Sequence, residues 1–277
     1  MSAPTVVAAS RSSRLAWAAA DTWVVARRHL WHLLRRPDEL LGTLMIPVLA
    51  VAMFGFVFGD ALGAAMAVPG TEYREFLLPG LFALTMAFGI GNTTIATAAD
   101  VRGGVLDRMR SLPMSPVAFL AGRSLADVLV ALVELAILMG LGVLFGWQWH
   151  SGPGPVLAAL ALLILLRAAC SWVGILLGLL VSGPEAAMKY FALVFPLAMV
   201  ADTVVPTHLM PGWLAGPAGW NPLSATVVAI RDLFGNPAGP SASWVADHAV
   251  PMAVAWPLAI TALCLPLALA RLRGLAR

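Results

Sequence analysis

Residues 155–181 read PVLAALALLILLRAACSWVGILLGLLV, an apolar run whose single charged side chain is Arg167. A hydrocarbon core about 30 Å thick is crossed by roughly 20 helical residues, so this run is long enough to span a bilayer at a tilt. The whole chain shares this character: of its 277 residues 60% are hydrophobic and 11% charged, whereas soluble domains carry about 25% charged residues. We therefore expect an integral membrane protein.

Five other runs are long and apolar enough to cross the membrane, which predicts an all-α, polytopic protein with six transmembrane helices. The predicted spans are 40–60, 76–99, 125–146, 155–181, 188–206 and 249–270. The domain organisation that follows is a cytoplasmic tail with an interfacial helix over 1–37 and a membrane domain over 38–277. Within the membrane domain, 100–123 forms a cytoplasmic loop and 207–248 an outer region.

The segment before the first span has one apolar and one basic face when it is placed on a helix. Aromatic and basic residues of this kind suit a helix that lies in the membrane interface. The residues expected to mark it are Trp23, Arg27, Arg28, Arg35 and Arg36. The segment lacks the unbroken apolar stretch and cleavage site of a signal peptide.

Orientation follows from the distribution of Arg and Lys between the two sides. With the N-terminus in the cytoplasm, 14 of the 17 basic residues fall in inner segments and only Arg74 and Arg231 in outer ones, while Arg167 lies within a span. Both termini are therefore expected in the cytoplasm.

The outer region is too apolar to be a simple loop. Asn221 and Pro222 read as an N-cap and first helical residue, and Gly235 reads as the end of that helix. At about 13 residues the helix is too short to span, which favours a re-entrant or interfacial position. The residues singled out in this region are Pro211, Trp213, Asn221, Pro222 and Arg231.

Charged and polar residues inside spans are expected to pair or to face a cavity. Glu134 and Arg167 both fall near mid-membrane, where they could form a buried salt bridge between adjacent helices or line a substrate path. Asn92, Thr93 and Thr97 could bond back to their own helix or face cargo. Asp202 could cap or hydrate a helix end, or gate the exit.

Enzyme motifs are missing from the sequence. It contains no HExxH, no GxSxG and no GxxxxGK[ST], and the sole lysine, Lys189, is not preceded by glycine. Cys170 and Cys264 lie inside apolar runs, so neither a disulfide scaffold nor a metal site is expected. The formal net charge of +3 is too slight to suggest nucleic acid. We expect no catalytic residue, and any uphill transport must draw energy from a partner or an ion gradient.

Four sequence motifs occur in order along the predicted topology: FLLPGLFALTMAFG at 76–89, LDRMRSLPMSP at 106–116, MPGWL at 210–214 and NPLSATVVAIRDLFG at 221–235. The first begins the second span, the second lies in the cytoplasmic loop, and the last two lie in the outer region. Together with the order of the predicted segments, they resemble the type-2 ATP-binding-cassette exporter permeases, and in particular the daunorubicin-resistance permease branch. The resemblance covers nearly the whole chain.

This resemblance implies a permease that pairs with a second copy or a close paralogue in the bacterial plasma membrane. A separate cytoplasmic ATPase subunit would bind ATP and magnesium. It also implies that the loop after the second span docks on the ATPase, that the N-terminal helix makes a second contact, and that the outer helices close the exit. The docking role would fall on Asp100, Arg102, Leu106, Asp107, Arg108, Arg110, Leu112 and Pro113.

The implied cargo is an amphipathic drug, antibiotic or lipid-like molecule. A polysaccharide or lipid-linked glycan exporter of the same family is the nearest alternative. An ion-coupled carrier without an ATPase is the alternative from a different class, because a few charges do lie in the spans.

Overall fold

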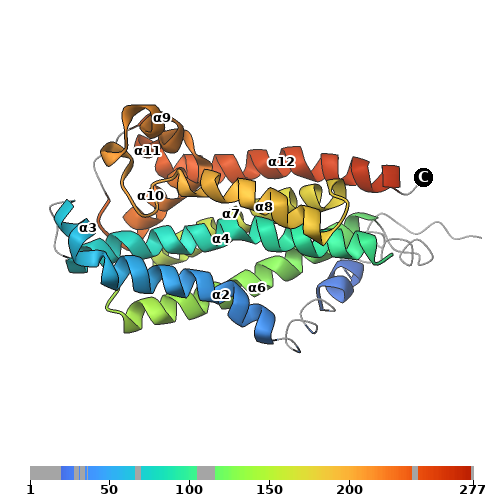
Figure 1. Cartoon of the computed structure of the whole chain (residues 1–277), viewed down its shortest axis with the longest axis horizontal. Helices are drawn as coiled ribbons and strands as arrows, with labels where there is room; N and C mark the ends of the chain where they lie inside the picture. The colour runs from blue at the N-terminus through green and yellow to red at the C-terminus, as the bar shows by residue number, and fades with distance from the viewer. Residues whose placement is uncertain are drawn as a thin grey trace, which may run out of the picture.

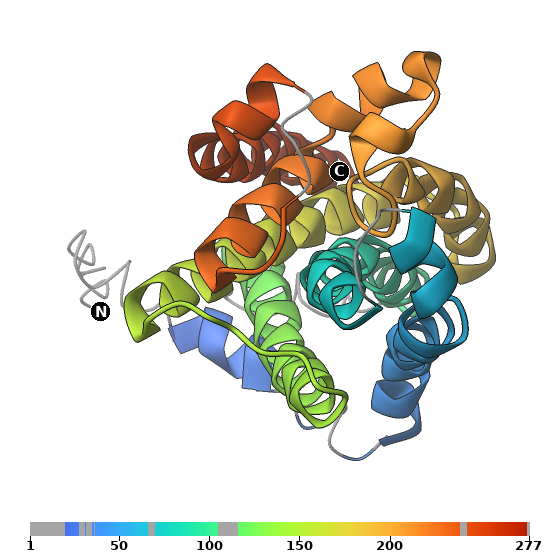
Figure 2. The same ribbon diagram turned by 90° about the vertical axis from the view of Figure 1, so that its left-hand side faces the viewer.

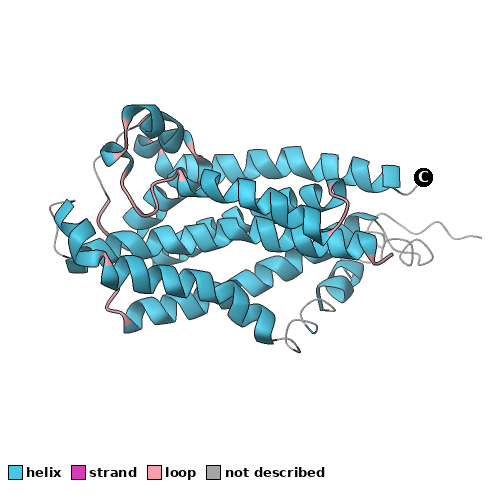
Figure 3. Ribbon diagram, in the orientation of Figure 1, coloured by secondary structure: helices cyan, strands magenta, loops and turns pink. Residues whose placement is uncertain are grey.

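The computed structural model describes residues 20–27, 31, 35, 37–65, 70–104, 116–238 and 243–275. Within these ranges every regular element is helical (Figure 3), which confirms the all-α prediction. In chain order the elements are α2 (Pro37–Ala52), η1 (Met53–Val57), α3 (Gly59–Ala65), α4 (Gly70–Arg102), α6 (Pro116–Leu144), α7 (Pro153–Leu180), α8 (Pro184–Met199), η2 (Thr207–Leu209), α9 (Gly212–Trp220), α10 (Pro222–Phe234), α11 (Trp244–Asp247) and α12 (Ala249–Leu275).

α4 is the central helix of the bundle. In its most apolar stretch 83% of the residues are buried, compared with 28% in α6 and 22% in α12. Its main partner is α7, and α8, α10, α6 and α2 also pack against it. Figure 2, viewed along the bundle, shows α4 surrounded by these helices.

Small residues allow α4 and α7 to approach closely. A methyl group added at Gly174 would lie 2.7 Å from the backbone oxygen of Ile90, and one at Gly178 would lie 2.8 Å from that of Thr94. Glycines at such contacts let helix backbones come together, as they commonly do between helices in membranes. The α4–α7 pair therefore forms the rigid centre of the fold.

The long helices alternate in direction between two ends of the bundle (Figure 1). We call η2, α9, α10 and α11 the cap; these elements gather at one end, near α3. At the opposite end, which we call the terminal end, α12 finishes and the helical residues 20–27 lie. The described N-terminal segment and the C-terminal helix thus share one end of the molecule, in the arrangement that the orientation analysis requires.

Four of the described helices are long and apolar enough to cross a membrane: Glu72–Arg102, Val117–Leu144, Pro153–Leu180 and Ala249–Gly274. They correspond to the second, third, fourth and sixth predicted spans. The first appears as a shorter apolar helix over Leu44–Val57. The fifth was expected over 188–206, but α8 begins at Pro184 and ends at Met199 and is followed by turns. The six-span topology therefore stays a prediction.

Candidate functional site

Arg167 lies at the centre of a buried ion network between α4, α6 and α7. Its Nε donates to Oδ2 of Asp127 at 2.7 Å, and its Nη2 donates to Oδ1 of the same carboxylate at 2.8 Å. This two-pronged geometry is the strongest form of an arginine–carboxylate pair. The Arg167 side chain is 2% exposed and that of Asp127 13% exposed, so the pair is shielded from solvent.

Glu134 is the second carboxylate of this network. One of its oxygens lies 3.6 Å from Nη1 of Arg167, and both side chains are 2% exposed. The expected Glu134–Arg167 ion pair is therefore present, although at a distance longer than a hydrogen bond. Asp127, which the sequence analysis did not single out, is the principal partner of the arginine.

α4 contributes both polar groups and space to the network. Thr93 donates its hydroxyl to Oδ1 of Asp127 at 3.0 Å, and Nη1 of Arg167 reaches the backbone oxygen of Thr85 at 3.5 Å. Gly89 leaves room for the guanidinium, because any Cβ at this position would overlap with it. One ion cluster thus joins the three helices that meet at the middle of the bundle, and removing one partner of a buried pair is costly.

The polar residues predicted on α4 point in different directions. Thr93 faces the network, whereas Thr94 donates back to the backbone oxygen of Ile90 at 2.6 Å, the local bond typical of helical threonines. The Thr97 hydroxyl is buried and has no hydrogen-bond partner within the described residues. Asn92 is exposed. The structure therefore separates Asn92 from the threonines beside it.

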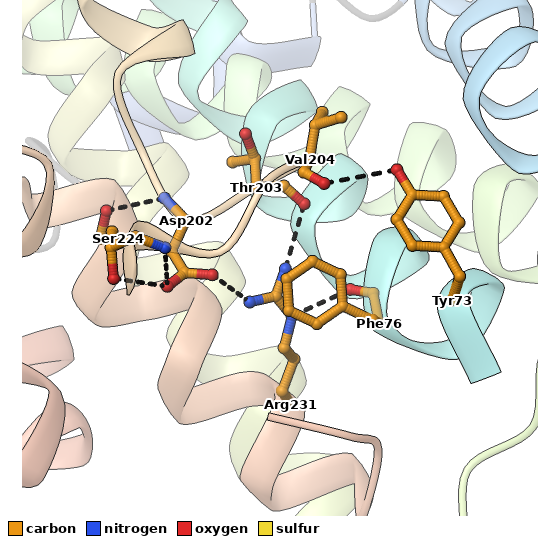
Figure 4. A network of polar contacts seen from close by, with 8 residues as sticks. Tyr73, Phe76, Asp202, Thr203, Val204, Ser224 and Arg231 are labelled. Carbon is orange, nitrogen blue, oxygen red and sulfur yellow. Dashed lines mark hydrogen bonds and ion pairs between the residues drawn. The ribbon is translucent and has the colours of Figure 1, made fainter. Parts of the chain in front are cut away.

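A second buried network fastens the cap to α4 (Figure 4). Arg231 of α10 donates to Oδ1 of Asp202 at 2.6 Å, to the backbone oxygen of Phe76 at 2.9 Å and to that of Thr203 at 3.0 Å. Its guanidinium carbon lies 3.4 Å from the centre of the Phe76 ring. Burial lowers the pKa of the Arg231 guanidinium while the Asp202 carboxylate opposes this change, and arginine remains protonated.

Asp202 belongs to this network and does not cap or hydrate the end of α8. Its backbone N–H donates to Oγ of Ser224 at 2.9 Å, and its second carboxylate oxygen accepts from Thr207 at 3.2 Å. The helix ends three residues earlier, at Met199. The expectation that Asp202 caps or hydrates the helix end was therefore wrong, because Arg231 and Thr207 bind its carboxylate. The alternative, that Asp202 gates the exit, stays a prediction.

The helix predicted in the outer region follows the sequence prediction locally, while its re-entrant position stays a prediction. Asn221 precedes α10 and accepts from the backbone N–H of Leu223 at 2.9 Å, Pro222 is the first helical residue, and Gly235 adopts a left-handed conformation with φ of 71°. The Asn221 amide also donates to the backbone oxygen of Val200 at 2.6 Å. Pro211 precedes α9, and Trp213 within α9 is 78% exposed.

Trp147, in the connection between α6 and α7, contacts the cap at the end of α10. Its indole N–H donates to Oδ1 of Asn236 at 3.0 Å, and the Asn236 amide donates to the backbone oxygen of Gln148 at 2.7 Å. The ring packs edge-on against Phe82 and Phe234. Together with Arg231, this contact ties the C-terminal end of α10 to α4 and to the connection between α6 and α7.

The predicted docking residues lie only partly within the described chain. Asp100 forms an ion pair with Arg123, which connects the end of α4 to the start of α6, and Arg102 is exposed. In the N-terminal segment Trp23 and Arg27 are exposed on a helix over 20–27, and Arg35 lies over the Trp31 ring. Outside the described residues lie Leu106, Asp107, Arg108, Arg110, Leu112, Pro113, Arg28 and Arg36.

The N-terminal helix packs against α6. Val25 and Ala26 are buried, and a methyl group added at Gly122 would lie 2.7 Å from both the backbone oxygen of Thr22 and Cβ of Val25. Gly122 therefore provides the space in which this helix rests on α6, one turn before the helix carries Asp127 into the bundle.

Comparison with known proteins connects this arrangement to a family of membrane transporters. Residues 20–234 match the family described as ABC-2 type transporter. The chain is 32% identical over 216 residues to the daunorubicin resistance ABC transporter permease protein DrrB1 of Streptomyces coeruleorubidus, covering 76% of this chain and 75% of the relative.

Two further relatives match a similar share of the chain. The putative transport permease ycf38 of Cyanophora paradoxa is 25% identical over 219 residues, covering 78% of this chain and 74% of the relative. The probable doxorubicin resistance ABC transporter permease protein DrrC of Mycobacterium tuberculosis is 25% identical over 215 residues, covering 76% of each.

Proposed function

The chain belongs to the ABC-2 type transporter family, and from this premise we propose that it is the permease subunit of an exporter driven by a separate ATPase. The observation that carries the proposal is the extent of the family match, which runs from residue 20 to residue 234. The matched region includes the helix over 20–27, the connection between α4 and α6, both buried ion networks and α10. The ATPase subunit would supply the ATP and magnesium sites, for which this chain has no phosphate-binding loop.

The connection between α4 and α6 is the docking element in this proposal. α4 ends and α6 begins at the terminal end, where the Asp100–Arg123 ion pair joins the two helices. α4 and α6 then enter the bundle and share the Arg167 network through Thr93 and Asp127. A displacement of the loop by the ATPase would therefore act on two helices that are joined again at mid-membrane. Nucleotide would shift the population between two arrangements of these helices.

The cargo in this proposal is an amphipathic drug, antibiotic or lipid-like molecule. Support comes from two relatives that are named as daunorubicin and doxorubicin resistance permease proteins. In the cap, a recess beside Asp202, Thr207 and Ser224 has a volume of only about 10 Å³, which is room for about one water molecule and far below the roughly 300–1,000 Å³ of ordinary small-molecule sites. The cargo path would accordingly lie between two permease copies instead of in this recess.

The proposed location is the bacterial plasma membrane, with both termini and the docking loop in the cytoplasm. The supporting observation is the excess of Arg and Lys in the predicted inner segments, of which the helix over 20–27 and the end of α12 lie at the terminal end (Figure 1). The cap would then lie on the outer side, where it closes the exit until the helices rearrange.

The decisive experiment is purification of the tagged permease from native membranes in a mild detergent, followed by mass spectrometry of the proteins that accompany it. We expect a soluble ATPase with a phosphate-binding loop in an amount about equal to the permease. A matched preparation of a variant with Arg108→Glu and Arg110→Glu should yield folded permease with less ATPase. Good recovery of the unaltered permease without any ATPase would contradict the proposal and favour an ion-coupled carrier.

A further inference from the structure

Asn92 occupies an unusual position on the central helix. From Tyr73 to Ala98 every residue of α4 is buried or half-buried except Asn92, which is exposed. Within the described part of the chain no hydrogen bond reaches its amide. The most enclosed helix of the fold therefore presents one polar side chain outward.

The depth of Asn92 makes this exposure significant. Asn92 lies eight residues before Asp100, which is near the terminal end of the bundle. The distance between the two residues along the axis of α4 is therefore about 12 Å. That distance is close to half of a hydrocarbon core about 30 Å thick. An amide in contact with lipid at this depth would lack the hydrogen bonds that water provides, at a cost in free energy.

Asn92 also faces away from the network described above. Thr93 and Gly89 point to α7 and its arginine, and Asn92 is rotated from Thr93 by about 100° around the helix. Its neighbours on the outward face are the half-buried Phe88, Ile95 and Ala96 and the exposed Ala99. The face around the amide is thus apolar, uncharged and built partly of small residues.

The outward surfaces of the peripheral helices differ from this face. α6 exposes Leu132, Val133 and Ile137, and α12 exposes Leu258, Leu263 and Leu267. These large aliphatic side chains are suited to lipid contact. An asparagine followed on the same face by Ala96 and Ala99 is suited to contact with another helix, because small residues allow close approach and side-chain amides bond across helix pairs in membranes.

We propose that Asn92 lies at the contact between two copies of this chain and forms a reciprocal amide pair with Asn92 of the second copy. A two-fold interface brings a residue near the axis against itself. Asparagine suits this position because its carbonyl oxygen accepts and its NH₂ group donates, so two symmetric amides satisfy each other. The inference rests on the proposed function, which calls for a second permease copy, and it specifies the helix face through which the copies meet.

The first test is cysteine crosslinking in membranes. Cys170 and Cys264, both buried and free, are replaced by alanine, and Asn92→Cys is compared with Leu258→Cys, whose position on α12 is 52% exposed. Mild oxidation should join Asn92→Cys into dimers that a reducing agent separates, while Leu258→Cys stays monomeric. Crosslinking at the α12 position only, or labelling at position 92 by a water-soluble thiol reagent with protection by cargo, would overturn the inference.

The second test measures association directly with amide variants. Asn92→Leu should weaken dimer formation in detergent about 3- to 30-fold, the range expected for one polar contact between membrane helices, whereas Asn92→Gln, which keeps the amide, should retain most of it. Unchanged thermal unfolding of the monomer serves as the folding control. Equal dimerisation of all three proteins would refute the amide pair.

Native mass spectrometry of the unaltered complex distinguishes a failure of the assigned contact at Asn92 from a failure of the proposed second permease copy. Two permease copies with no crosslink at position 92 would refute only the assigned contact. A single copy in the complex would refute the second copy in the proposed function as well.

Discussion

Replacement of Asp127 by asparagine is expected to destabilise the protein more than replacement of Glu134 by glutamine. Asp127 binds Arg167 through two bonds of 2.7 and 2.8 Å, whereas Glu134 approaches the same guanidinium only to 3.6 Å. Breaking one partner of a buried pair costs about 3–5 kcal/mol. Because the substituted amide would keep one acceptor and Arg167 would keep Glu134, we expect Asp127→Asn to lower the free energy of unfolding by about 3 kcal/mol. Glu134→Gln leaves both bonds between Arg167 and Asp127 in place and keeps a polar group at this buried position, so it should cost less, about 1 kcal/mol.

The assay is a double-mutant cycle on reversible unfolding in mixed detergent and SDS micelles. Combining Asp127→Asn with Arg167→Gln should recover at least about 1 kcal/mol of the summed single losses, because the unpaired arginine is removed. Combining Glu134→Gln with Arg167→Gln should recover less. Strict additivity of the Asp127 and Arg167 losses, or a larger loss for Glu134→Gln than for Asp127→Asn, would refute this assignment of the network.

Three other outcomes can be checked with single variants. Gly80→Ala should lower the free energy of unfolding by about 1–3 kcal/mol, because the added Cβ would overlap with the backbone oxygen of Thr203. The control Gly140→Ala, which has open space around it, should be neutral or stabilising by up to about 1 kcal/mol. Equal effects of the two substitutions would contradict the close contact at Gly80. Arg231→Lys should cost about 2 kcal/mol or more in thermal or SDS unfolding, since an ammonium group cannot reproduce the three bonds of the guanidinium; wild-type stability would show that charge alone suffices. In sealed cells an impermeant thiol reagent should label Leu209→Cys in the cap but not Arg273→Cys at the terminal end, and the reverse labelling would invert the orientation.

Much of the local structure could be predicted from the sequence. The start of α10 at Asn221 and Pro222, and its end at Gly235, required only the bonding needs of helix termini. The long apolar runs became α4, α6, α7 and α12, because crossing hydrocarbon demands a continuous apolar helix. However, α6 begins at Pro116, nine residues before the predicted start and inside the stretch that was expected to be loop. These features depend on neighbouring residues along the chain.

The principal ion pair could not be predicted in the same way, although one signal was present. Asp127 and Glu134 are seven residues apart, so they share a face of α6, and a charged residue within a span calls for a partner. Depth along the helix pointed to Glu134 as the partner of Arg167. The long arginine side chain instead reaches toward the terminal end, where Gly89 leaves space for it and Thr93 contacts the same carboxylate.

By itself the sequence determined that this chain belongs in a membrane, which segments form its long helices and which segments carry the basic residues, because each of these properties is set by composition and by contacts a few residues apart. Only the tertiary structure decided that Arg167 binds Asp127 more closely than Glu134 and that Arg231 joins Asp202 to Phe76 beneath the cap. It alone decided, too, that Asn92 points outward while Thr93 points inward. The physical reason is that these outcomes depend on the rotation and depth of packed helices, which small residues such as Gly89 and Gly174 set through contacts far apart along the chain.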